Sequence, residues 1–273
     1  MLTALSAVNS AGDKLDLPLG DSSSGYLVKG VSGLDPVKAT FTTSTRANIP
    51  GSSFRSGTRE SRNVVLSLEL KPDFWNKTGG SLRSWLYNFF NPGEQITLQV
   101  FLDGLLFGSL VGRTETFEAD MFTKRPSATI SVLCFDPDIV GEPSTFGPFS
   151  TDPNAWRELT YEGTSPTGFV MELGPFVSAR TGFQVIVKNS LGEKTLNFSD
   201  SILASDTIKL STVLGDKFIR RTRSGVQTSV LYGASVDSRW AVLQPGVNQI
   251  RVSTAGTSPF PWNLVYDPRY GGI

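Results

Sequence analysis

Residues 95–112, QITLQVFLDGLLFGSLVG, have the pattern of a β-hairpin. Two runs of mainly apolar residues flank Asp103-Gly104, and this dipeptide favours a type I′ turn because both of its residues need a positive φ. The stretch NVVLSLEL (residues 63–70) alternates with a period of two, which predicts a strand with one buried face. We expect that face to hold Val64, Leu66, Leu68 and Leu70. Similar short runs, separated by glycine and proline, continue along the chain and predict a mainly β protein with antiparallel sheets.

One segment, SLRSWLYNFFNPGE (residues 81–94), departs from this alternation and predicts a short amphipathic helix. Ser81 is a candidate N-cap, and the Asn91-Pro92-Gly93 turn ends the helix because proline disfavours a helical conformation in the residue before it. The apolar stripe has helical spacing, and such a stripe more often packs on a sheet than binds a ligand. Its residues are Leu82, Trp85, Leu86, Phe89 and Phe90.

The chain has 273 residues, enough to bury two hydrophobic cores. Strand-like alternation stops at Pro137, and a proline-rich stretch without apolar periodicity follows, which is typical of a linker. Strand and turn patterns then resume. We therefore predict an N-terminal domain over 1–137, a linker over 138–153 and a C-terminal domain over 154–273.

The composition excludes several classes of function. The chain has 25 basic and 25 acidic residues, one cysteine and no histidine. Without histidine, neither a Ser-His-Asp triad nor a cysteine–histidine pair can form, and a Cys/His zinc site is impossible within one chain. All-oxygen calcium or magnesium sites and a hydrolase built on carboxylates alone stay compatible, but no acidic pair lies in a pocket-like motif. We therefore predict a protein that is not an enzyme and has no catalytic residue, cofactor or metal.

The single cysteine, Cys134, lies in ISVLCFDP (residues 130–137). Alternate residues of this stretch place apolar side chains on both faces of the predicted strand, so Cys134 is expected in a core. No cationic residue or imidazole lies nearby in the sequence to lower the thiol pKa. We predict a buried structural thiol.

Several stretches resemble the distal tail proteins, the Dit family, of long-tailed bacteriophages with siphovirus tails. In the N-terminal half these are LDLPLG (15–20), GYLVKGVSGLDPVKATF (25–41), GSSFRSGTRESRNVVLSLEL (51–70), the predicted helix and ISVLCFDP (130–137). In the C-terminal half they are VIVKNSLGEKTLNF (185–198), LGDKFIRRTRSGVQTSVLYG (214–233), RWAVLQPGVNQIRVSTAG (239–256) and VYDPRYGGI (265–273). The order and spacing of these stretches cover nearly the whole chain.

The resemblance implies a belt-type β-sandwich with one short helix, followed by a galectin-like β-sandwich. It implies a structural virion protein whose N-terminal domain forms a hexameric ring at the end of the tail tube. The expected partners are the tail tube protein, the tail-tip hub or baseplate and, in some relatives, tape-measure and receptor-binding proteins that serve host attachment. The expected location is the tail tip of the virion, after assembly in the host cytoplasm. Neither sequence-specific nucleic acid binding nor membrane insertion is expected.

Four arginines, Arg46, Arg55, Arg59 and Arg62, lie in a stretch rich in glycine, serine and threonine that is expected to form a loop. Arginine is favoured at interfaces because its planar fork binds carboxylates with two hydrogen bonds, so these residues are candidates for the ring interface. An ordinary surface cluster explains them equally well.

The alternative function is a carbohydrate-binding module that contacts a host cell-surface glycan. Trp156, Trp240 and Trp262 could supply stacking platforms for sugars, and core positions are the simpler explanation for them.

Overall fold

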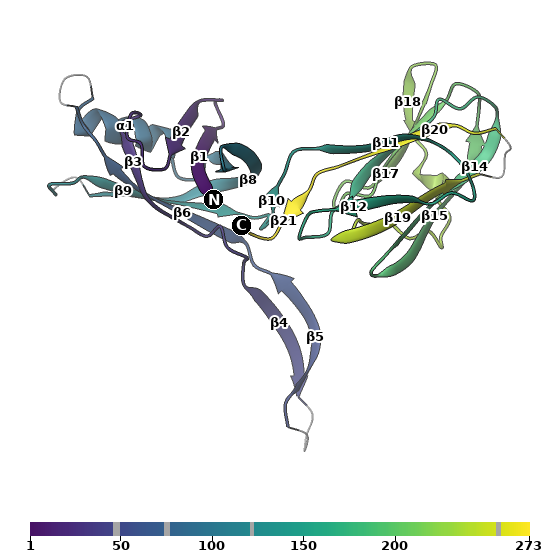
Figure 1. Cartoon of the computed structure of the whole chain (residues 1–273), viewed down its shortest axis with the longest axis horizontal. Helices are drawn as coiled ribbons and strands as arrows, with labels where there is room; N and C mark the ends of the chain where they lie inside the picture. Colours follow the sequence, from purple (N-terminus) through teal and green to yellow (C-terminus); the bar gives the residue numbers. More distant parts are fainter. Residues whose placement is uncertain (46–49, 74–76, 121–122, 255–257) are drawn as a thin grey trace. The chain divides into compact units, whose positions relative to one another are not determined.

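The computed structural model describes residues 1–45, 50–73, 77–120, 123–254 and 258–273. The chain is mainly β and divides into two compact units (Figure 1). Unit 1 consists of residues 1–141 together with 270–273, and unit 2 consists of residues 142–269. The chain therefore leaves unit 1 once and returns to it for its last four residues.

Unit 1 is built on a nine-stranded sheet whose neighbouring strands pair in antiparallel fashion. The main path runs through β2 (Lys14–Pro18), β1 (Leu2–Asn9), β7 (Gln95–Leu102), β8 (Leu105–Asp120), β9 (Ser127–Cys134), β6 (Arg62–Leu70) and β3 (Tyr26–Ser32). Two short strands, β10 (Ile139–Val140) and β21 (Arg269–Tyr270), are attached beside this path. The β7–β8 hairpin confirms the sequence prediction, since Asp103 and Gly104 have φ angles of 51° and 83°.

The core of unit 1 follows the alternation of its strands. Val64, Leu66, Leu68 and Leu70 of β6 are all buried, as predicted. Helix α1 (Gly79–Phe89) contributes Leu82, Leu86 and Phe89 to the same core, and Phe90 just beyond it is also buried.

Two details of the helix differ from the prediction. The N-cap is Thr78, whose Oγ1 accepts a hydrogen bond from the Ser81 backbone N–H at 3.2 Å, so the cap lies three residues before the expected one. Trp85 is 44% exposed and stacks on Tyr26 and Phe89, so it lies at the edge of the core rather than inside it.

The stretch expected to form a loop between β3 and β6 contains a separate two-stranded sheet. Strands β4 (Ala39–Thr45) and β5 (Ser52–Arg59) pair in antiparallel fashion and extend away from the nine-stranded sheet (Figure 1). Threonine and serine dominate both strands, and β-branched threonine favours an extended backbone. Periodicity gave no sign of these strands because neither has a buried apolar face.

Unit 2 is a β-sandwich of two sheets around its own apolar core. One sheet has the order β11 (Ser144–Ser150), β20 (Pro261–Tyr266), β13 (Phe169–Leu173), β16 (Thr207–Ser211), β17 (Phe218–Arg223) and β18 (Val226–Ser229). The other has the order β12 (Arg157–Tyr161), β19 (Gly246–Ser253), β14 (Arg180–Asn189) and β15 (Gly192–Ile202). A 3-10 turn, η1 (Leu231–Gly233), follows β18.

The boundary between the units differs from the predicted one. Residues 138–153, predicted as a linker, contain β10 and β11, which pair with strands of unit 1 and unit 2 respectively. Prolines interrupt the alternation of apolar residues in this stretch, so the sequence pattern did not predict these two strands. The tail over 270–273, predicted as part of the C-terminal domain, belongs to unit 1, where Tyr270 packs its ring on Phe107 at a centroid distance of 4.5 Å.

Cys134 is fully buried at the end of β9, as the sequence predicted. Burial raises the pKa of its thiol from 9.0 to about 11, an effect that Arg62 partly opposes. Because the pKa is higher in the folded chain, the neutral thiol contributes stability below about pH 9, and this contribution is lost as the pH rises through about 11.

We expect Cys134 to resist an aromatic disulfide reagent at pH 8 in the folded chain and to react at once after denaturation, because the thiol is buried and protonated. Absorbance of the released thiolate measures the reaction, and Cys134→Ser is the blank. Rapid stoichiometric labelling of the native protein would contradict the buried assignment.

Candidate functional site

The four candidate arginines do not form one cluster. Arg46 lies outside the described residues. Arg55 is exposed on β5, where its Nε donates to the Ser44 hydroxyl on β4 at 2.9 Å. Arg59, at the end of β5, makes a two-pronged ion pair with Asp138, in which Nη2 donates to Oδ2 at 2.9 Å. The Asp138 carboxylate is 3% exposed, so this pair fixes the base of the hairpin to the chain just after β9.

Arg62 is a structural residue rather than a surface contact, because only 1% of it is exposed. Its Nε donates to the Pro137 carbonyl at 2.7 Å, and Nη1 donates to the carbonyls of Gly33 and Asp35 at 2.7 and 2.8 Å. Its Nη2 donates to the Gly271 carbonyl at 2.6 Å. One guanidinium thus joins the segment after β3, the segment after β9 and the C-terminal tail.

The burial of Arg62 has an electrostatic cost. Removal from water lowers the pKa of the guanidinium from its ordinary value, while the neighbouring Cys134 and Asp138 act in the opposite direction. Arginine keeps its charge in proteins, so the four carbonyl dipoles must replace its hydration. Arg62 is therefore not a candidate for the ring interface, which corrects the prediction made from the sequence.

The β4–β5 hairpin presents an exposed surface of unit 1. All eight residues of β5 are exposed. Phe41 on β4 and Phe54 on β5 are 62% and 65% exposed, and their rings meet edge to face at a centroid distance of 5.9 Å. We call these two residues the hairpin aromatic pair. A Cβ on Gly57 would lie 3.0 Å from the Phe41 ring, so glycine at this position leaves room for the pair.

The two described strands of the hairpin bury no apolar face against the rest of the described chain. Isolated two-stranded hairpins are marginal in water, and exposed aromatic side chains normally mark a contact surface. The only sequence signal for this surface was two phenylalanines among serines and threonines, without the alternation that identifies a strand. The sequence prediction named the arginines of the same stretch and not the aromatic pair.

The tryptophans named for sugar stacking have different environments. Trp262 is 3% exposed and belongs to the core of unit 2. Trp240 is partly buried against that core, with the Lys217 amine 5.9 Å from its ring centre. Trp156 is partly buried beneath the Arg251 guanidinium, which lies 4.5 Å from its ring centre.

Within the described residues, no group of three or more histidine, cysteine, aspartate or glutamate side chains is arranged to hold a metal ion. The helices in that part of the chain are also too short or too polar to cross a membrane.

The whole-chain architecture has a counterpart among solved structures. The crystal structure of the phage SPP1 Dit protein, described as a paradigm of the hub adsorption apparatus in phages that infect Gram-positive bacteria, matches with a TM-score of 0.70. The match covers 97% of this chain and 98% of that one, at 14% sequence identity. The fold is that of a phage distal tail protein. The mainly β fold with one short helix that the sequence resemblance implied is therefore confirmed.

Two further solved structures match with TM-scores below 0.5. The phage P2 baseplate in its calcium-activated conformation covers both chains fully, with 9% identity and a TM-score of 0.47. A fructofuranosidase from Schwanniomyces occidentalis complexed with fructose covers 95% of this chain and 64% of that one, with 9% identity and a TM-score of 0.25. No protein-family model and no curated protein matches the sequence.

Replacing Arg62 should destabilise unit 1 strongly. We expect Arg62→Leu to lower the free energy of unfolding by on the order of 3 kcal/mol, because four buried carbonyl groups lose their donor. Arg62→Lys should restore only part of this loss, since an ammonium cannot reproduce the planar fork. The exposed Arg55→Ala is the matched control, and its unfolding free energy should be nearly unchanged.

Chemical denaturation measures these stabilities, and amide hydrogen exchange on β6 and β9 reports on unit 1 alone. Equal stabilities for Arg62→Leu and Arg55→Ala would contradict the structural role of Arg62.

Proposed function

We propose that the chain is a distal tail protein of the Dit family, a structural component of the virion tail tip. It forms a hexameric ring at the end of the tail tube, joins the tube to the tail-tip hub or baseplate and supports the proteins that attach the phage to its host. The observation that carries this proposal is the likeness of fold to the SPP1 Dit protein along the full length of both chains. Fold alone does not fix function, so the proposal also needs a surface suited to assembly.

The hairpin aromatic pair is that surface. A ring forms when one surface of a copy binds a different surface of the next and the rotation closes. The β4–β5 hairpin extends from unit 1 and exposes two aromatic rings, the residue type enriched in interface cores. Pairing with the neighbouring copy would bury these rings and stabilise a hairpin that has no apolar face of its own to bury.

The other properties of the chain suit a scaffold. Its formal net charge is zero, so a ring made from it has no overall positive charge to retain DNA passing along the axis. Its reactive groups are few, since the single thiol is buried and histidine is absent. The proposed role is therefore to connect and position other proteins, without turnover.

Substituting the aromatic pair should prevent ring formation without unfolding the chain. We expect Phe41→Ser/Phe54→Ser to shift the solution mass to that of a monomer, because the double variant removes two exposed rings. The control is Leu214→Ser/Val236→Ser, which removes two side chains of unit 2 that are 88% and 101% exposed. This control should keep the hexameric mass of the parent chain.

Native mass spectrometry and light scattering over a concentration series, with and without purified tail-tube ends, provide the measurement. A parent chain that stays monomeric under all these conditions would overturn the proposed function. A hexamer that survives loss of the aromatic pair would overturn only the assigned interface.

A further inference from the structure

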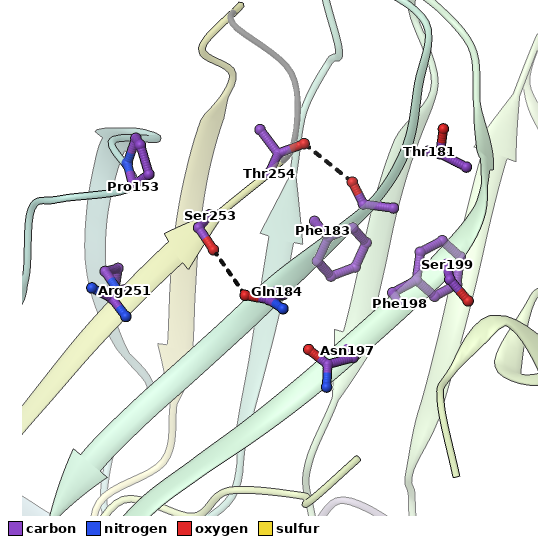
Figure 2. Close-up of a pocket in the computed structure, with 11 residues that line it drawn as sticks. Pro153, Thr181, Phe183, Gln184, Asn197, Phe198, Ser199, Arg251, Ser253 and Thr254 are labelled. Atoms are coloured by element: carbon purple, nitrogen blue, oxygen red, sulfur yellow. Dashed lines mark hydrogen bonds between the residues drawn. The ribbon is translucent and has the colours of Figure 1, made fainter. Parts of the chain in front are cut away.

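A cleft of about 500 Å³ lies on the four-stranded sheet of unit 2, over strands β14, β15 and β19 (Figure 2). Gln184 on β14 is in register with Asn197 on β15 and with Ser253 on β19, so their side chains form a row across the exposed face of the sheet. Arg251 is in register with the next outward-facing position of β14. Thr254 closes one end of the cleft, where its Oγ1 donates to the Gly182 carbonyl at 3.2 Å.

The cleft presents mainly hydrogen-bonding groups. Amides and hydroxyls line it together with a single charged side chain, Arg251. Phe183 and Phe198 also border the cleft, but their rings stack at a centroid distance of 4.9 Å within the apolar core of unit 2, so the face open to a ligand is mainly polar. Among the described residues, neither the buried Asn197 Oδ1 nor the buried Arg251 Nε has a hydrogen-bond partner. A buried polar atom without a partner is costly, and a polar ligand in the cleft could satisfy both.

Two of the polar side chains and the backbone at Asn197 are held in place before any ligand arrives. The backbone N–H of Asn197 donates to the Ser238 hydroxyl, which donates back to the Asn197 carbonyl, both at 3.0 Å, and these bonds fix the strand position of Asn197. The Arg251 guanidinium is supported by the face of Trp156. Ser253 donates from Oγ to Gln184 Oε1 at 3.3 Å. A site whose groups are already oriented loses less conformational entropy on binding.

The kinds of group in the cleft narrow the class of ligand. Nucleic acid needs several cations along its phosphates, and the cleft has one. A peptide needs a pocket for an apolar anchor, and the two aromatic rings beside the cleft are buried in the core of unit 2 and cannot form one. A saccharide has hydroxyl groups that both donate and accept hydrogen bonds, which the amides and hydroxyls of the cleft match.

We propose that this cleft binds a saccharide, with Asn197, Gln184 and Ser253 contacting its hydroxyl groups. The fork of Arg251 binds either two neighbouring hydroxyls or the carboxylate of a sugar acid. The site lies within unit 2 and does not require ring formation, so it goes beyond the scaffold role and can fail or succeed independently of it.

Binding of defined oligosaccharides to the full-length chain tests the proposal. The probes are chitotetraose, a galactose tetramer and tetragalacturonate, and isothermal titration calorimetry measures the affinity. We expect at least one probe to bind, and Arg251→Ala and Asn197→Ala each to weaken that binding at least about tenfold, the effect of losing one good hydrogen bond to a polar ligand. Affinity for tetragalacturonate alone, falling as salt rises, would identify a sugar acid at Arg251.

The matched control is Lys188→Ala, which removes an exposed cation from β14 outside the cleft and should leave the affinity within about twofold of the parent. Gln184→Ala serves as a second cleft variant because Gln184 is exposed and its loss should not affect folding. Failure of every probe to bind at about 10 mM overturns the proposal. Binding that survives all three cleft substitutions in folded variants also overturns it.

Discussion

The Arg62 guanidinium is the interaction on which the architecture of unit 1 depends. A cation buried to 1% exposure must have its hydration replaced, and here four main-chain carbonyls replace it. Those carbonyls belong to three segments that are far apart in the sequence. The last of them, Gly271, lies in the four-residue tail that follows unit 2, so the ends of the chain are parts of one folded unit. Unit 2 is consequently an insertion between Gly141 and Tyr270 of unit 1.

The same region contains both a buried anchor and the proposed contact surface. Arg62 begins β6 and faces inward, whereas Arg59, three residues earlier, anchors the base of the hairpin through Asp138. Beyond that anchor the hairpin buries almost nothing, and its two phenylalanines face solvent. Unit 1 therefore combines a base held by buried arginine contacts with a hairpin whose aromatic side chains are exposed. The exposed hairpin supplies the surface that the proposed ring uses to bind the next copy.

Sequence patterns predicted the features that depend on neighbours along the chain. The Asp103-Gly104 turn follows from the local φ requirement of two residues, and the buried leucines of β6 follow from strand alternation. The burial of Cys134 follows from the same logic applied to both faces of β9. The expectation of a belt-type and a galectin-like sandwich came from the family resemblance and not from the periodicity of apolar residues.

The sequence patterns did not predict features that depend on residues far apart in the chain. Nothing near Arg62 in the sequence shows that a carbonyl 209 residues away accepts from it, so it was grouped with surface arginines. The β4–β5 strands lack an apolar face, and the β10 and β11 strands lie among prolines, so neither pair has the usual alternation. The cleft on unit 2 needs three strands brought into register, which local patterns cannot reveal.

Electron microscopy of the phage tail tip, with the chain marked by an antibody fragment against unit 2, tests the central claim most directly. It reports copy number, symmetry and position together. The account predicts a closed ring of six copies, with an axial opening, at the end of the tail tube and above the hub. A different symmetry, an open filament, or a label confined to fibres away from the tube end would contradict it.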